Sequence, residues 1–226
     1  MANIIVSGGA GALGAAVFRR LVSNGNQVIV VDLAPVSHYG SAAIGGVDLA
    51  DERAVALAYA DATTRLGSVD GLVNLTGGFI WQPLVGGSVE AWDRMYRINL
   101  RTTVLSCRAA LEHMKGKRGA IVNVGAAGAA NPSAGMAPYG ASKAGVLALT
   151  ESLADELRAR RIRVNAVMPT IIDTPANRRD MPGADTTDWV QPDDVATVIA
   201  FLLSDQAAAI SGSSIKLTMG SDEKAV

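Results

Sequence analysis

The sequence predicts an α/β protein built on one doubly wound parallel sheet with helices on both faces. Short runs rich in Val and Ile alternate with longer amphipathic runs, and a glycine-rich turn follows the first short run. A chain of 226 residues is long enough for one well-buried domain of this kind. Right-handed crossovers then bury both sheet faces, which gives a Rossmann-type fold that binds ligands beyond the carboxyl ends of its strands.

The first half of the chain gives four of the expected strands. Strand patterns cover residues 3–7, 27–32 and 71–75, and a weaker one covers 42–48. Helical patterns cover residues 13–24 and 51–66. A glycine-rich loop that contains Pro83 follows the strand at 71–75, so we expect this loop at the rim of a binding site.

The second half continues the alternation. Helix is expected over residues 88–114 with a break near Asn99, over 139–160, and over 192–204 after Pro192. Strands are expected at 120–124, 163–168 and 214–217, while 125–138 and 170–189 lack strong periodicity. No internal repeat or linker is evident, so residues 1–226 are expected to form a single domain.

Composition and charge narrow the possible partners. The formal net charge is −1, from 20 Lys and Arg against 21 Asp and Glu, which favours a small molecule over nucleic acid or an anionic membrane. The single cysteine, Cys107, lies in an apolar helical run and is expected in the core. His38 and His113 are far apart, with no cluster at ligand spacing, so no metal site is expected.

The beginning of the chain runs directly into a strand pattern. No basic segment followed by a long apolar stretch precedes it, and no apolar run elsewhere reaches membrane-spanning length. We therefore expect a cytoplasmic protein.

A candidate phosphate-binding turn lies between the first strand and the first helix, in Ser7-Gly8-Gly9-Ala10-Gly11-Ala12-Leu13-Gly14. Small residues there let backbone N–H groups approach a pyrophosphate at the helix N-terminus. Asp32 ends the second strand, where a carboxylate can accept hydrogen bonds from ribose hydroxyls and repel a 2′-phosphate. The pair favours NAD(H), although a tight strand-to-helix turn and a loop-starting Asp are simpler explanations.

A candidate proton donor lies further along the chain, in Tyr139-Gly140-Ala141-Ser142-Lys143. Residues four apart share one helical face, so the ammonium of Lys143 is expected near the phenol of Tyr139. A nearby positive charge favours the phenolate and lowers the pKa of tyrosine. The sequence thus predicts a general acid whose pKa is moved toward working pH.

Together these motifs resemble the short-chain dehydrogenase/reductase family over nearly the whole chain. Residues 7–14 are similar to its T-G-x-x-x-G-x-G turn, with Ala12 in place of the middle glycine. Asp48-Leu49 resembles the family's adenine-contacting segment, and Asn74-Leu75-Thr76-Gly77 resembles its N-N-A-G segment with the second asparagine replaced. Contacts made by that second asparagine are therefore in question.

The resemblance also assigns roles near the reacting atoms. It implies that Tyr139 is the general acid/base, that Lys143 lowers its pKa and binds the nicotinamide ribose, and that Asn99 holds a water for proton relay. Pro169 and Thr174 match the segment over the nicotinamide. The implied activity is hydride transfer between NAD and a small carbonyl, alcohol or quinonoid/imine substrate, with homodimers or homotetramers formed through residues 99–114 and 139–160.

One expected residue is absent, because the family's serine stands thirteen residues before the tyrosine and that position is Ala126. An alanine there, with this glycine turn, is similar to the dihydropteridine reductase subfamily. Loss of one hydrogen-bond donor could cost roughly 10²–10³ in rate on a carbonyl. Either the substrate is activated by its own electronics, or Ser133 or Thr76 supplies a hydroxyl.

Residues 170–189 match the family's substrate-covering flap and are expected to form a short lid. Side chains that could line an apolar wall are Trp81, Met136, Met181 and Trp189, although each is equally consistent with packing. Arg178 and Arg179 are candidates for binding a carboxylate or for a solvated surface.

Two other classes of function stay open at this point. The chain could be a nucleotide-binding sensor that binds NAD(H) without turnover, as Ala126 suggests, or a structural subunit that binds no NAD. The presence of Tyr139, Lys143 and Asn99 favours the enzyme.

Overall fold

The computed structural model describes residues 1–115 and 118–219, and its described strands form one parallel sheet. The strand order is β3-β2-β1-β4-β5-β6-β7. The strands are β1 (Asn3–Ser7), β2 (Gln27–Val31), β3 (Ala43–Ile44), β4 (Gly71–Asn74), β5 (Gly119–Val124), β6 (Ile162–Pro169) and β7 (Ser214–Leu217). The predicted doubly wound parallel sheet is confirmed.

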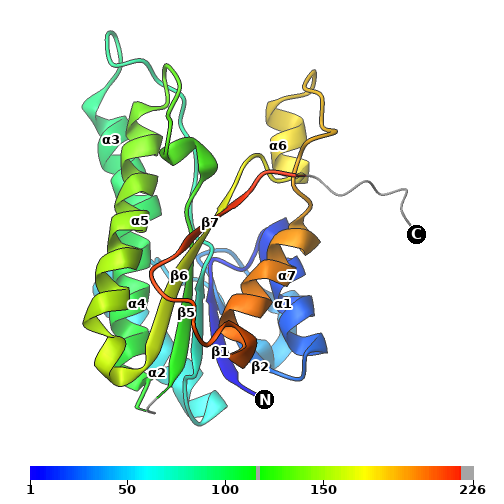
Figure 1. Cartoon of the computed structure of the whole chain (residues 1–226). Coiled ribbons are helices and arrows are strands. Elements are labelled where there is room, and N and C mark those ends of the chain that lie inside the picture. Colours follow the sequence, from blue (N-terminus) through cyan, green and yellow to red (C-terminus); the bar gives the residue numbers. More distant parts are fainter. Residues whose placement is uncertain (116–117, 220–226) are drawn as a thin grey trace.

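Helices cover both faces of the sheet (Figure 1). They are α1 (Ala12–Ser23), α2 (Glu52–Leu66), α3 (Val89–Met95), α4 (Thr102–His113), α5 (Ala137–Glu156), α6 (Pro175–Asp180) and α7 (Pro192–Leu203). One face is covered by α2, α4 and α5, and the other by α1 and α7.

Alternation along each strand divides the core into two layers. Ile5 of β1 packs with α2 and α4, whereas its neighbours Ile4 and Val6 pack with α1 and α7. Burying each such side chain contributes about 1.5–3 kcal/mol, which favours the observed assignment of side chains to the two faces. Cys107 belongs to the first layer and is 2% exposed, which confirms its core position.

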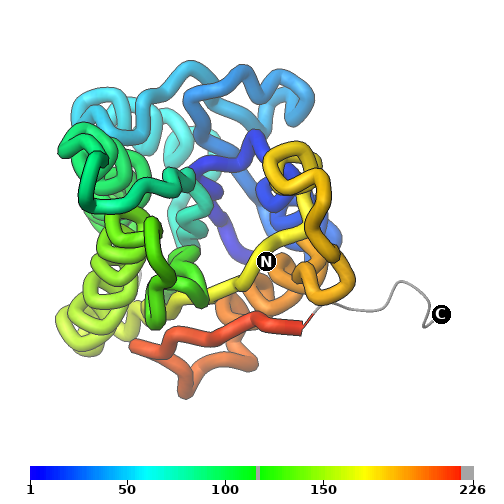
Figure 2. The backbone as a smooth tube through the Cα atoms, turned by 90° about the horizontal axis from the view of Figure 1, so that it is seen from above, coloured from blue at the N-terminus to red at the C-terminus, as the bar shows by residue number. Residues whose placement is uncertain are grey.

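The chain reverses direction across the sheet between β1 and β4. From β1 it runs outward through β2 and β3, then crosses back to β4 and continues to β7. The carboxyl ends of β1 and β4 therefore border a crevice that no connection closes. In the view onto this edge (Figure 2), the loops that follow the strands surround the start of α1.

Three elements differ from the sequence prediction. The strand expected at 42–48 is only Ala43–Ile44, because the chain turns at Gly45-Gly46, where Gly46 has φ 75°. The helix expected over 88–114 widens into a π-helical segment at Tyr96–Arg101, which contains Asn99 and accounts for the expected break. The region 170–189 holds the short helix α6, whose first turn is capped by the Thr174 side chain.

In the described part of the chain, no helix has both the length and the apolar character needed to cross a membrane.

The turn after β1 depends on tight packing at Gly14. A Cβ added there would overlap the carbonyl oxygen of Gly9, whereas one added at Gly183, in an exposed loop, meets no atom within 4 Å. We predict that Gly14→Ala lowers the free energy of unfolding by about 1–3 kcal/mol, since backbone must move to admit the methyl group. Gly183→Ala should change it by less than about 0.5 kcal/mol in the same urea titration. Equal effects would contradict the packing argument.

Candidate active site

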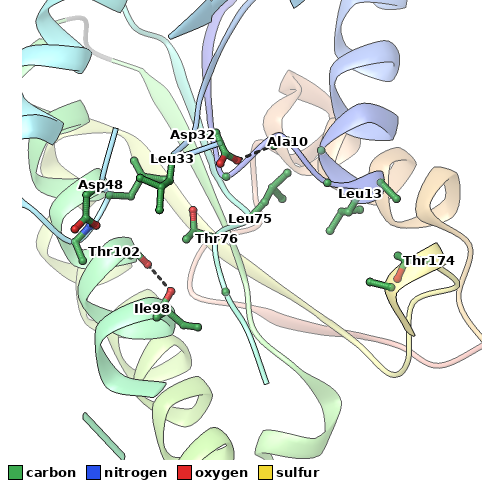
Figure 3. A pocket seen from close by; sticks show the side chains of 18 of the residues that line it. Ala10, Leu13, Asp32, Leu33, Asp48, Leu75, Thr76, Ile98, Thr102 and Thr174 are labelled. Carbon is green, nitrogen blue, oxygen red and sulfur yellow. Dashed lines mark hydrogen bonds between the residues drawn. The ribbon is translucent and has the colours of Figure 1, made fainter. Parts of the chain in front are cut away.

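A cavity of about 740 Å³ lies at the carboxyl edge of the sheet, over the crevice between β1 and β4 (Figure 3). Most of the residues that the sequence predicted to bind cofactor line it. These are Gly8, Gly11, Ala12, Leu13, Gly14, Asp32, Asp48, Leu49, Gly77 and Thr174. The volume lies within the range of small-molecule and cofactor sites.

The glycine turn forms one wall of this cavity. Gly8 has φ 81°, a conformation that favours glycine, and its N–H donates to the carbonyl of Val31 at 2.8 Å. Gly11 precedes the first turn of α1, and a Cβ there would meet no atom within 4 Å, so its surroundings are open. The first N–H groups of α1 lack partners within the helix, and the turn therefore fits a phosphate group.

Asp32 lies at the end of β2, beside this turn (Figure 3). One carboxylate oxygen accepts the N–H of Ala10 at 2.9 Å and the other accepts the N–H of Ala34 at 2.8 Å. Each oxygen keeps a further lone pair, so the fixed carboxylate can still accept a hydroxyl donor. The geometry fits a ligand that offers hydroxyl donors, such as a sugar diol.

Asp48 and Leu49 line the far end of the cavity. The Asp48 carboxylate accepts the N–H of Ala50 at 2.9 Å and pairs with Arg97 at 2.6 Å. Arg97 comes from the π-helical segment, so this ion pair links the end of the cavity to the helix that carries Asn99.

Asn74 and Pro169 do not line the cavity. The amide of Asn74 is buried and donates to Asn123 Oδ1 at 2.8 Å and to Cys107 Sγ at 3.3 Å, so its side chain belongs to the core. Pro169 is buried at the end of β6. Thr174 lines the cavity, while its hydroxyl oxygen accepts the N–H of Asn177 at 3.1 Å.

Lys143 and Asn99 meet at Gly77. A Cβ on Gly77 would lie 2.7 Å from Asn99 Oδ1 and 3.0 Å from Lys143 Nζ, so only glycine admits both side chains. Lys143 Nζ donates to the carbonyl of Val124 at 2.8 Å, at the end of β5. Because Gly77 also lines the cavity, two of the predicted catalytic residues, Asn99 and Lys143, stand at its edge.

Asn99 uses its whole amide to hold its neighbours. Its Oδ1 accepts the N–H of Gly78 at 2.9 Å, and its Nδ2 donates to the Gly78 carbonyl at 3.1 Å and to Ser142 Oγ at 2.9 Å. Ser142 in turn donates to the Tyr139 carbonyl at 2.7 Å. This chain of bonds ties the π-helical segment, the loop after β4 and α5 together.

The prediction that Lys143 lowers the pKa of Tyr139 is wrong for the chain by itself. Burial raises the pKa of Tyr139 to about 12, and burial lowers the pKa of Lys143 to about 8. The Lys143 ammonium is directed at the Val124 carbonyl, and desolvation outweighs any effect of its charge on the phenol. Tyr139 is thus a protonated acid at neutral pH.

The position that lacks the serine is buried and close to the lysine. Ala126 is 6% exposed and lies two residues after Val124, whose carbonyl holds Lys143. The two proposed replacement hydroxyls have different surroundings. Ser133 is exposed, and the Thr76 hydroxyl is buried against Gly8 without a hydrogen-bond partner in the described residues.

Two exposed aromatic side chains follow Gly77, and one of them contacts Tyr139. The ring of Phe79 meets the Tyr139 ring edge-on, with centroids 5.0 Å apart, and is 56% exposed. Trp81 is also exposed, and its Nε1 donates to the carbonyl of Ala134 at 3.1 Å. Trp189, expected as a possible wall residue, is 4% exposed and packs in the interior instead.

Several functional positions were missed by the sequence. Phe79 lies just after the motif that ends at Gly77, and Ser142 lies directly before Lys143. Their positions next to these motifs could have identified both. The cavity is also lined by residues that were not predicted to bind cofactor, namely Ala10, Leu33, Ala50, Leu75, Arg97, Ile98, Thr102, Pro175, Ala176 and Arg179. Most are neighbours of a predicted residue, whereas Arg179 had only a general assignment to carboxylate binding or solvent.

Across residues 1–115 and 118–219, no group of three or more His, Cys, Asp or Glu side chains is arranged to hold a metal ion.

The fold and this cavity define a dinucleotide-binding oxidoreductase with Lys143 and Asn99 at the cavity's edge. The chain belongs to the short chain dehydrogenase family, whose model matches residues 2–184. The match covers the glycine turn, Asp32, Asn99, Tyr139, Lys143 and Thr174.

Named relatives and a solved structure agree with this assignment. The chain is 31% identical to 2-(S)-hydroxypropyl-CoM dehydrogenase 3 of Xanthobacter autotrophicus, over 96% of this chain and 95% of the relative. It is 35% identical to the inactive 2-(S)-hydroxypropyl-CoM dehydrogenase 2 of the same organism, over 76% and 82%. The crystal structure of 3-ketoacyl-(acyl-carrier-protein) reductase from Brucella melitensis with NADH superposes with a TM-score of 0.84 at 28% identity, covering 95% and 96%.

The buried ammonium of Lys143 predicts a pH-dependent stability. Its pKa is about 8 in the folded chain and has an ordinary value of 10.5, so between these values the unfolded chain binds more protons. We predict that the free energy of unfolding of the wild type rises relative to that of Lys143→Met between pH values of about 8 and 10. Urea titrations of both proteins across this range test it, and a difference that does not change with pH would contradict it.

Proposed function

We propose that this protein is an NADH-dependent oxidoreductase that interconverts a small carbonyl, or a conjugated imine or quinonoid group, and its reduced form. The observation that carries the proposal is the meeting of Lys143, Asn99 and the cavity at Gly77. This arrangement supports an acid at the same edge of the sheet as the phosphate-binding turn and Asp32.

The chain's own residues have distinct tasks in this reaction. A bound nicotinamide dinucleotide supplies or accepts the hydride. Tyr139, a protonated phenol at neutral pH, donates a proton to the substrate atom that is reduced, and Lys143 keeps a buried ammonium one turn further along the same helix. Asn99 fixes Gly78 and Ser142, and through them the neighbourhood of Tyr139.

The choice of NADH over NADPH rests on Asp32. Its carboxylate is held by two backbone N–H groups at the place where a 2′-phosphate would lie, and like charges repel there. No Lys or Arg follows Asp32 closely in the sequence to neutralise such a phosphate.

The substrate class rests on Ala126 and on Phe79. Without a serine at Ala126, a substrate activated by its own conjugation needs less assistance from the protein. Phe79 presents an exposed aromatic ring beside Tyr139, which favours a flat, apolar substrate. A quinonoid pterin, as the resemblance to dihydropteridine reductase implies, belongs to this class.

A second candidate is a sensor that binds NADH without turnover. Ala126 favours it, and the similarity to a relative named as inactive is consistent with it. We also propose that the chain forms homodimers or homotetramers through α4 and α5, whose sequences carry many small residues.

Turnover that depends on Tyr139 is the first test. The wild type should oxidise NADH faster than NADPH with a panel of quinonoid, conjugated and simple carbonyl substrates. We predict that Tyr139→Phe lowers kcat by roughly 10²–10⁴-fold, because the proton donor is lost. Tyr96→Phe, at a tyrosine that is 53% exposed, is the matched control and should retain activity. Tight NADH binding without turnover on any substrate would favour the sensor.

Restoring the hydroxyl is the second test. We predict that Ala126→Ser raises kcat/KM on simple carbonyl substrates by roughly 10²-fold, because it adds the missing hydrogen-bond donor. Activity on conjugated substrates should change much less. Ala130→Ser, at an exposed position of the same segment, is the control. Equal gains on both substrate types would argue against substrate activation as the substitute for serine.

A further inference from the structure

Helix α6 faces the glycine turn across the cavity. Gly11, Ala12, Leu13 and Gly14 line one side, and Thr174, Pro175, Ala176 and Arg179 line the other. The close-up shows Leu13 and Thr174 at the same end of the cavity, opposite the end at which Asp48 lies (Figure 3). The cavity therefore lies between the N-terminus of α1 and the short helix of the lid.

The two ends of the lid segment are joined to each other at its base. Ile172 and Val190 form a parallel bridge, and the N–H of Asp173 donates to the Val190 carbonyl at 2.9 Å. Asn177 Nδ2 donates to the Ile172 carbonyl at 2.8 Å, which attaches α6 to this base. The helix is thus held in a defined place at its start.

Charge across the cavity is uneven. Among the described residues that line it, the cations are Arg97 and Arg179, and the anions are Asp32 and Asp48. Arg97 is already paired with Asp48 at 2.6 Å, at the end away from the glycine turn. The turn itself contains no Lys or Arg. A pyrophosphate on the turn would therefore have Arg179 as its available counter-charge.

The preceding arginine has a different environment. Arg178 donates two hydrogen bonds to Asp173, at 2.5 and 2.6 Å, and does not line the cavity. The side chains of consecutive helical residues point about 100° apart. Arg179 can therefore face the glycine turn while Arg178 is held on Asp173. The two arginines provide a matched pair with one charge each.

From this arrangement we infer that Arg179 binds the pyrophosphate of the dinucleotide and so fastens the lid over the bound cofactor. The inference rests on the proposed use of a nicotinamide dinucleotide. A substrate carboxylate is a weaker partner for Arg179, because the reacting atom must lie at Tyr139, which does not line this cavity. Arginine also matches the geometry of phosphate oxygens with paired N–H donors.

The test measures binding rather than turnover. Dissociation constants for NADH, ADP-ribose and adenosine are determined calorimetrically for the wild type, Arg179→Gln and Arg178→Gln. We predict that Arg179→Gln raises the dissociation constants of NADH and ADP-ribose by roughly tenfold, as expected for a lost charged hydrogen bond. The dissociation constant of adenosine should not change. Arg178→Gln should change all three by less than about twofold. Added salt should weaken NADH binding more in the wild type than in Arg179→Gln.

The possible failures are separable. Equal losses of NADH affinity in the two variants, or no loss in Arg179→Gln, would overturn the role of Arg179. The proposed cofactor would still be supported if the wild type binds NADH. An increased KM for an anionic substrate with unchanged NADH affinity would assign Arg179 to the substrate instead. A wild type that binds neither NADH nor ADP-ribose would overturn the proposed function itself.

Discussion

The arrangement of the site depends on where the Lys143 ammonium is held. A buried positive charge needs an acceptor, and the carbonyl of Val124 supplies one at the point where β5 ends. This hydrogen bond sets α5 against the sheet edge, and Tyr139 follows because it lies one turn earlier on the same helix. Gly77 then leaves room for Asn99 and Lys143 to approach each other. The helix that carries the acid is placed by its charge as well as by apolar packing.

The π-helical segment adds a second constraint. A regular α-helix through 96–101 would turn successive side chains at a fixed angle, and the widened turn changes the direction in which Asn99 points. Asn99 pairs with both backbone groups of Gly78, as a neighbouring strand would. The loop after β4 is thereby held without belonging to the sheet, and Phe79 stays beside the tyrosine.

Much of the fold and part of the site could be predicted because their signals are local. The apolar runs predicted the seven strands. The motifs around Gly14, Asp32 and Tyr139 predicted a site at the carboxyl edge of the sheet, where the cavity lies. Other features depend on contacts between distant segments. Asn74 fits the family motif, yet its amide is used by Asn123 and Cys107. The Tyr139 pKa was predicted in the wrong direction, because burial and the carbonyl that holds Lys143 are properties of the folded chain. Helix α6 has six residues and no apolar stripe, so it is marked only by its cap at Thr174 and by Pro175 at its first position.

The two loops beside Tyr139 are joined to each other. Trp81 donates to the Ala134 carbonyl, and the Gln82 N–H donates to the Gly135 carbonyl at 2.7 Å. Gly135 has φ 79°, and a side chain there would collide with the Trp81 ring. Loop exchange aimed at a new substrate would therefore fail if only one segment were transplanted. The segments around 79–82 and 133–136 therefore act as one structural unit. We expect relatives with different substrate ranges to differ in the sequences of both segments together.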